Sequence, residues 1–232
     1  MISDNFIEPG WLDSVRGSIF YYPAAGDDTA EPIYFLKEVI QNFWFCDTHY
    51  DANLELPRAL PKESGYDITL AMKHGVIGAE FEERTDNKGK TYKYLEPSRL
   101  TEEYQNDSSI LTVHRRRGFG QIALSLEFEN NSIGVFMHRG DSKGEGGSDC
   151  YFLANKKASF KPCNRLLDKL EVKLKDQAII ISDGSNSKIP WLSIFHHKDV
   201  TGRDAYLHHQ FKLYQYGSYI WICIGWLGSR YL

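Results

Sequence analysis

The chain lacks the short motifs that would assign it to several large families. Its 232 residues contain no C-x-x-C pair, no P-loop and no G-x-S-x-G elbow around a nucleophilic serine. A zinc ribbon, a P-loop nucleotidase and an α/β-hydrolase are therefore disfavoured. Long apolar runs are missing too. A membrane-spanning helix needs about 20 apolar residues, and the best run, 219–227, has about half that length. We expect no contact with a membrane.

An excess of positive charge and a secretion signal are also missing. The net charge is -4 with both signs mixed along the chain, unlike that of a strongly basic nucleic-acid binder. Residues 1–5 contain no basic region followed by an apolar stretch, so they do not read as a secretory signal. The cysteines have no paired spacing and suit a reducing compartment. We expect a soluble, cytoplasmic protein whose thiols are unpaired, namely Cys46, Cys150, Cys163 and Cys223.

The sequence does contain a strand–turn–helix–strand pattern near its start. An aromatic and branched run over residues 18–23 is typical of a strand, and residues 24–28 predict a tight turn. A helix is expected next, because Pro32 fits a first helical turn, where no N–H donor is needed. The apolar run 43–46 predicts a second strand. This pattern has the size of a βαβ unit, so residues 1–65 should contain two parallel strands joined by a right-handed crossover.

The middle of the chain, residues 66–130, reads as a β-rich insertion. The β-prone runs 76–82 and 91–95 flank a Gly-containing turn at 85–90, which predicts one hairpin. The runs 110–115 and 121–128 predict another hairpin, with a turn between them.

The last part, residues 131–232, is expected to complete the sheet. Apolar runs predict strands at 133–138 and 178–181. The runs 211–216 and 219–225 flank a Gly-Ser turn and predict an antiparallel hairpin. The sequence therefore predicts a single α/β domain with a mixed sheet, a β-rich insertion and a C-terminal antiparallel hairpin.

In this order of elements the chain resembles the class I methyltransferases, whose Rossmann-like fold binds S-adenosylmethionine. In that family the first strand ends in a Gly-rich turn, and the second ends in an acidic residue. Here Gly26 lies in the turn, and Asp47 ends the second strand at about the 20-residue offset typical of such units. The resemblance implies that the backbone at Gly26 approaches the cofactor. It also implies that Asp47 accepts hydrogen bonds from the ribose hydroxyls.

Two adjacent carboxylates, Asp27 and Asp28, bear on which ligand the turn suits. They would repel a phosphate, which the free N–H groups at a helix start otherwise attract. A ligand with an ammonium group and a ribose, such as S-adenosylmethionine, suits carboxylates better. With Gly26 and Asp47, these residues are the expected cofactor site. The alternative is that Asp28 or Thr29 caps the helix, because the helix dipole favours acidic residues there.

The loop 139–148 is the most unusual segment, because it holds four glycines in eight residues. It follows an expected strand, and open α/β sheets bind ligands at the carboxyl ends of their strands. We expect Asp141, Ser142 and Glu145 to line the site as candidate catalytic residues that flank the methyl acceptor. The alternative is a mobile surface loop.

The basic cluster Arg115, Arg116 and Arg117 is expected in the turn of a hairpin. Arginines there can hold the phosphates of a nucleic acid, and Phe119 can stack on a base. The alternative is a solvated turn whose charges serve solubility.

Two other functions remain open from the sequence. The chain can be a non-catalytic module on a degenerate Rossmann-like core, since its aromatic content of 14% suits a protein partner. It can also be a metal-dependent hydrolase, because imidazoles and carboxylates bind zinc and iron. Its ligands would come from two histidine pairs, His196–His197 and His208–His209, although no known metal spacing is matched.

Overall fold

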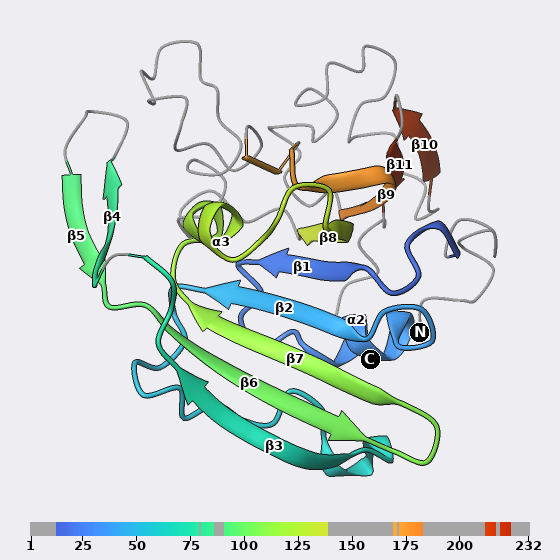
Figure 1. Cartoon of the computed structure of the whole chain (residues 1–232), viewed down its shortest axis with the longest axis horizontal. Helices are drawn as coiled ribbons and strands as arrows, with labels where there is room; N and C mark the ends of the chain where they lie inside the picture. Colours follow the sequence, from blue (N-terminus) through green and yellow to red (C-terminus); the bar gives the residue numbers. More distant parts are fainter. Residues whose placement is uncertain are drawn as a thin grey trace.

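The computed structural model describes residues 13–78, 80–85, 91–138, 169–170, 172–182, 212–216 and 219–223. In this part of the chain, nine strands form one mixed sheet (Figure 1). Two further strands, β4 (Glu82–Thr85) and β5 (Thr91–Leu95), form a separate antiparallel hairpin. The strands of the large sheet are β1 (Ile19–Pro23), β2 (Asn42–Asp47), β3 (Asp67–His74), β6 (Ser98–Gln105), β7 (Ile110–Arg117), β8 (Ile133–His138), β9 (Leu174–Ser182), β10 (Lys212–Tyr216) and β11 (Tyr219–Cys223).

The centre of the sheet is parallel and its two edges are antiparallel. The strand order is β10-β11-β9-β8-β1-β2-β7-β6-β3. The six strands from β11 to β7 are parallel to one another, whereas β10 at one edge and β6 and β3 at the other pair antiparallel. On one side of β1 lie β2, β7, β6 and β3, and after β7 the chain returns to form β8 on the opposite side of β1. The strand order therefore reverses between β1 and β8.

The first connection confirms the predicted βαβ unit. Helix α2 (Ala30–Leu36) joins β1 to β2, which pair in parallel. Pro32 lies in its first turn, and Ile33 and Leu36 are buried on the side that faces the sheet. Thr29 precedes the helix, but its side chain makes no capping hydrogen bond; its hydroxyl donates to Ala59 O instead.

The second connection corrects the sequence prediction. Residues 121–128 were expected as a strand, but helix α3 (Gly120–Leu126) lies there. A short apolar run does not distinguish a helix from a strand by its pattern. The chain must pass from β7 to the parallel strand β8 on the far side of β1, and such a connection needs a crossover, usually a helix. Ala123 and Leu124 bury this helix against the sheet.

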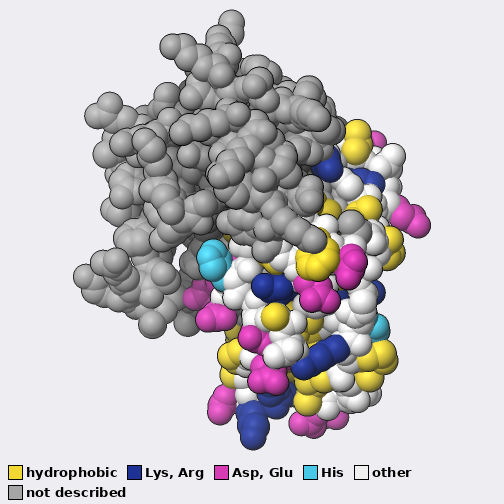
Figure 2. Space-filling view, turned by 90° about the vertical axis from the view of Figure 1, so that its left-hand side faces the viewer, with side chains coloured by type: hydrophobic (Ala, Val, Ile, Leu, Met, Phe, Trp, Pro, Cys, Tyr) yellow, Lys and Arg dark blue, Asp and Glu magenta, His cyan; other side chains and the backbone are white. Residues whose placement is uncertain are grey.

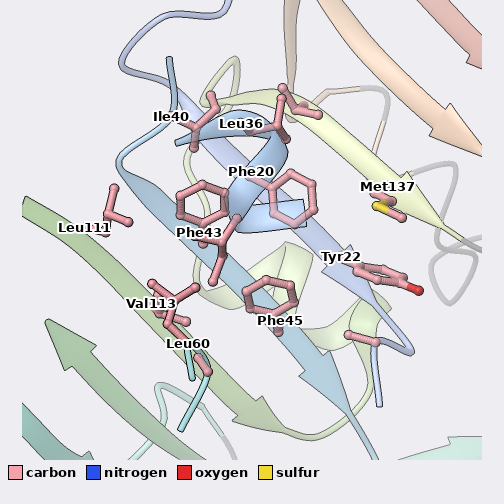
Figure 3. Packing of buried hydrophobic residues seen from close by; sticks show 14 of the residues in the cluster. Phe20, Tyr22, Leu36, Ile40, Phe43, Phe45, Leu60, Leu111, Val113 and Met137 are labelled. Atoms are coloured by element: carbon pink, nitrogen blue, oxygen red, sulfur yellow. The ribbon is translucent and has the colours of Figure 1, made fainter. Parts of the chain in front are cut away.

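Each face of the sheet has its own apolar core. On the α2 side, alternate residues of β1, β2 and β7 pack with the helix and with residues 54–60 (Figure 3). The rings of Phe20, Phe43 and Phe45 meet at its centre, with Phe20 5.5 Å from Phe43 and 5.6 Å from Phe45. On the α3 side the core contains Tyr21, Trp44, Cys46, Ala123, Leu124, Phe128, Ile133, Phe136, Leu170, Leu174 and Ala178.

The β-rich middle of the chain contributes to the main sheet. Its strands β3 and β6 extend the sheet at one edge, and β7 pairs with β2 in the parallel centre. A hairpin forms within 76–95 as β4 and β5, and it lies apart from the large sheet in Figure 1. Its second strand is where it was predicted, but its first strand is Glu82–Thr85 and not 76–82. The predicted C-terminal hairpin forms as β10 and β11. In the described part of the chain, no helix is long and apolar enough to span a bilayer.

Candidate functional site

The turn after β1 is built around two residues with positive φ. Ala24 has φ 56° and Gly26 has φ 53°, so the backbone twice enters the left-handed region. This region costs little for glycine and more for other residues. The turn lies against the end of β2, because Ala25 N donates to Cys46 O at 3.3 Å and Gly26 N donates to Asp47 Oδ2 at 2.8 Å.

Asp47 is buried at the end of β2, and both of its carboxylate oxygens bind within the protein. Oδ2 accepts the Gly26 N–H, and Oδ1 accepts the backbone N–H of His49 at 2.8 Å. The imidazole Nδ1 of His49 lies 3.1 Å from the same Oδ1. A carboxylate offers about four lone-pair sites, so Oδ2 keeps one acceptor direction. Asp47 thus fastens the turn to β2 and retains limited capacity for a ligand.

The two neighbouring acidic residues differ in exposure. Asp27 is exposed, and Asp28 is half-buried. The hydroxyl of Tyr22, at the end of β1, donates to Asp28 Oδ2 at 3.4 Å. The four expected cofactor residues Gly26, Asp27, Asp28 and Asp47 therefore lie together at the carboxyl edge of the sheet.

Figure 2 faces the edge toward which β1, β2 and β7 run, and its coloured part shows acidic, basic and histidine side chains among apolar ones. This edge is also where the strand order reverses between β1 and β8. The expected catalytic residues Asp141, Ser142 and Glu145 lie outside the described residues.

A buried tyrosine beside Asp47 was not singled out from the sequence. Tyr50 is 5% exposed, and its hydroxyl has no hydrogen-bond partner among the described residues. Burial, and then the negative charge of Asp47, raise the pKa of Tyr50 well above its usual value. Tyr50 therefore stays protonated and can donate a hydrogen bond. Its sequence signal was weak, because it is one of 14 tyrosines.

The arginine cluster does not lie in a hairpin turn, so that expectation is wrong. The three residues belong to β7, where successive side chains point to opposite faces. Arg115 is 4% exposed and lies 2.8 Å from Glu102. Arg116 is fully buried and pairs with Glu82 and Glu127.

Arg117 donates to the backbone carbonyls of Tyr50 and Glu96 at 3.0 and 2.7 Å. Nucleic-acid binding through these arginines stays a prediction, which the buried pairs of Arg115 and Arg116 disfavour. The carboxylates that bind Arg116 lie 11 and 34 residues away, and the carboxylate that binds Arg115 lies on the neighbouring strand β6. No local pattern therefore indicated the pairing.

The described residues provide little for other catalytic chemistries. Cys46 donates from Sγ to Gly118 O at 3.2 Å, and burial raises its pKa to about 12, so its thiol is a poor nucleophile. Within the described ranges, no three histidine, cysteine or acidic side chains group as metal ligands. The histidine pairs His196–His197 and His208–His209 lie outside those ranges.

Comparison of the chain with protein-family models, with curated proteins and with solved structures gives no match. The function must therefore be argued from the geometry of the carboxyl edge.

Proposed function

We propose that the protein has a Rossmann-like core and binds an adenosine-type cofactor, S-adenosylmethionine, as a methyltransferase-like protein. The observation that carries this proposal is the reversal of strand order between β1 and β8. In open parallel sheets, ligands bind outside the carboxyl ends of the strands at such a reversal. The turn 24–28 with its acidic residues stands at that point, directly after β1.

The residues of the turn suit a cationic ligand with a ribose. In this proposal Gly26 allows close approach of the backbone, and Asp27 or Asp28 pairs with the ammonium group of the ligand. Asp47 Oδ2 accepts a ribose hydroxyl through its remaining lone pair. A phosphate ligand would meet repulsion from the same carboxylates, so a dinucleotide suits the turn less well.

The proposed reaction requires little from the protein beyond positioning. Methyl transfer needs the nucleophile and the methyl group to be held in line, and a strong general base is not essential. The proposal assigns Asp141, Ser142 and Glu145 to the surroundings of the methyl acceptor.

Calorimetric titration with S-adenosylmethionine and S-adenosylhomocysteine tests the proposal. We expect wild type to bind S-adenosylmethionine. At least one of Asp27→Asn and Asp28→Asn should bind it about fivefold more weakly, because loss of the charge pair with the ammonium group costs up to about 1 kcal/mol. Asp107→Asn is the matched control, since Asp107 is an exposed aspartate in the β6–β7 turn at the opposite end of β7. Absence of binding by wild type at millimolar ligand would refute the proposal.

The second candidate is a non-catalytic protein-interaction module. Two backbone N–H groups already donate to the carboxylate of Asp47, which favours this candidate. In a degenerate core that no longer binds a cofactor, Asp47 would be needed only to stabilise the fold. Exposed apolar side chains on the edge strand β3, Ile68 at 37% and Met72 at 44%, would serve a partner. Failure of the titration would favour this candidate.

A further inference from the structure

Glu82 lies at the base of the β4–β5 hairpin and reaches the start of α3. Its side chain is buried, at 3% exposure. Oε2 accepts the backbone N–H of Phe119, the residue that precedes α3, at 2.6 Å. Oε1 pairs with the fully buried guanidinium of Arg116. One carboxylate thus holds both the end of β7 and the entry to α3.

The backbone that Glu82 holds is also bound to the end of β2. Gly118 N donates to Asp47 O at 3.1 Å, and Cys46 Sγ donates to Gly118 O. The residues Gly118 and Phe119 are therefore fixed from one side by β2 and from the other by Glu82.

This contact continues to the turn of the candidate site. The same Asp47 whose carbonyl accepts from Gly118 accepts the Gly26 N–H through its side chain. Three hydrogen bonds, joined through the backbone of residues 118–119 and through Asp47 itself, form a series from Glu82 to Gly26. Every bond in the series is 3.1 Å or shorter.

The close packing of Glu82 and Arg116 against the backbone requires a glycine at position 118. A Cβ on Gly118 would collide with the guanidinium of Arg116 and would lie 2.7 Å from Glu82 Oε2. Gly118 also has φ +152°, a conformation that other residues rarely adopt. The ion pair is thus packed directly against the backbone that contacts Asp47.

We propose that Glu82 is a positioning residue for the turn 24–28 of the candidate site. In this role Glu82 couples the β4–β5 hairpin to Asp47 and Gly26. The inference rests on the proposed function insofar as the turn binds a ligand. Glu127 provides the contrast, since it pairs with the same Arg116 at 3.2 Å and with Arg99 at 2.6 Å but makes no bond to Phe119 N. A purely structural role in neutralising Arg116 would be shared by both carboxylates.

Glu82→Gln and Glu127→Gln separate these roles. In wild type Arg116 and Phe119 N bind different oxygens of Glu82, Oε1 and Oε2. A glutamine at 82 replaces one of these oxygens by an NH2 group, which only donates, so one of the two donors loses its acceptor. We expect amide exchange at Gly118 and Gly26, followed by NMR, to become about tenfold faster in Glu82→Gln, as for loss of one buried hydrogen bond to a charged group. The same amides in Glu127→Gln should stay within about twofold of wild type. Equal acceleration in both variants, or unchanged exchange at Gly26 in Glu82→Gln, would overturn the inference.

Two further measurements keep the test independent of folding defects and of the ligand. Glu82→Asp retains the charge on a shorter side chain and should give an intermediate exchange rate at Gly26; a rate equal to wild type would count against the coupling.

Titration with S-adenosylhomocysteine should show weaker binding in Glu82→Gln than in Glu127→Gln. If wild type does not bind this ligand, the proposed function fails, whereas the exchange data still decide the coupling.

Discussion

At the scale of single residues, the burial of charged and titratable groups is the main feature. Asp47, Glu82, Glu102, Arg115 and Arg116 are all buried. Such groups are costly to bury unless they are paired or hydrogen-bonded. These groups are bound to one another or to backbone N–H groups, so removal of one partner should have larger effects than a surface substitution.

His114 allows a prediction about pH at this scale. Its Nδ1 lies 2.9 Å from Thr101 Oγ1, and its ring is 4.2 Å from that of Trp44. Burial, and then the charges of Arg99 and His74, lower the pKa of His114 from 6.5 to about 4. The folded protein therefore holds His114 neutral between these pH values, whereas the unfolded chain binds a proton. This linkage should reduce the free energy of unfolding as pH falls from 6.5 to 4, by up to about 3 kcal/mol.

Urea denaturation of wild type and His114→Gln over this pH range checks the linkage. The variant lacks the titrating group, so its free energy of unfolding should fall less steeply than that of wild type. His49→Gln is the control, since the side chain of His49 is 85% exposed, and it should follow wild type. Parallel curves for wild type and His114→Gln would contradict the assigned cause.

At the scale of elements, β8 packs closely against the side chain of Ser18, the residue that precedes β1. The pairing register shifts between Ile19 and Phe20, where β8 advances from Ile133 to Val135, so Gly134 forms an irregularity in the pairing. A Cβ on Gly134 would collide with Ser18 Oγ and lie 2.7 Å from Ser18 Cβ. A glycine in a strand interior often marks a place where another segment of the chain packs closely. Here it lies between the two strands at which the strand order reverses.

Gly134→Ala should therefore destabilise the protein through overpacking, by about 1–3 kcal/mol. The matched control is Gly75→Ala, because a Cβ on Gly75 meets no atom within 4 Å. The control should change stability by less than about 0.5 kcal/mol. Chemical denaturation of both variants measures the difference; equal stabilities would show that Ser18 and β8 can move apart without cost.

At the scale of the whole molecule, one core joins elements that are distant in sequence. The core on the α2 side contains residues from Val15 to Ile179. Phe20 is fully buried at its centre and contacts the rings of Tyr22, Phe43 and Phe45. This core fixes the strands whose carboxyl ends form the candidate site.

Phe20→Ala should lower the free energy of unfolding by about 3–5 kcal/mol, because it removes buried surface and leaves a cavity. Tyr34→Ala also removes a ring, but Tyr34 is 40% exposed on α2, so the loss should be below about 1 kcal/mol. Both values follow from urea denaturation at neutral pH. Similar losses in the two variants would mean that the ring of Phe20 is not central to the fold.

The sequence by itself determined the elements whose signals are local. Strands β1, β2 and β8 follow from short apolar runs, and α2 follows from its apolar spacing and from Pro32 in its first turn. The β10–β11 hairpin follows from two β-prone runs around a Gly-Ser turn. The sequence signals that place Gly26 and Asp47 at the strand ends are local too, so this part of the candidate site could be predicted.

Only the tertiary structure decided what depends on partners distant in sequence. Residues 120–126 form a helix because the connection from β7 to β8 must cross the sheet. Arg115 and Arg116 are buried because Glu102, Glu82 and Glu127 reach them from other elements. From sequence alone, a charged residue is interpreted as solvent-exposed, because an ion pair between residues on different elements leaves no local sequence pattern. For the same reason, the bonds from Asp47 to Gly26 and Gly118 emerged only from the folded chain.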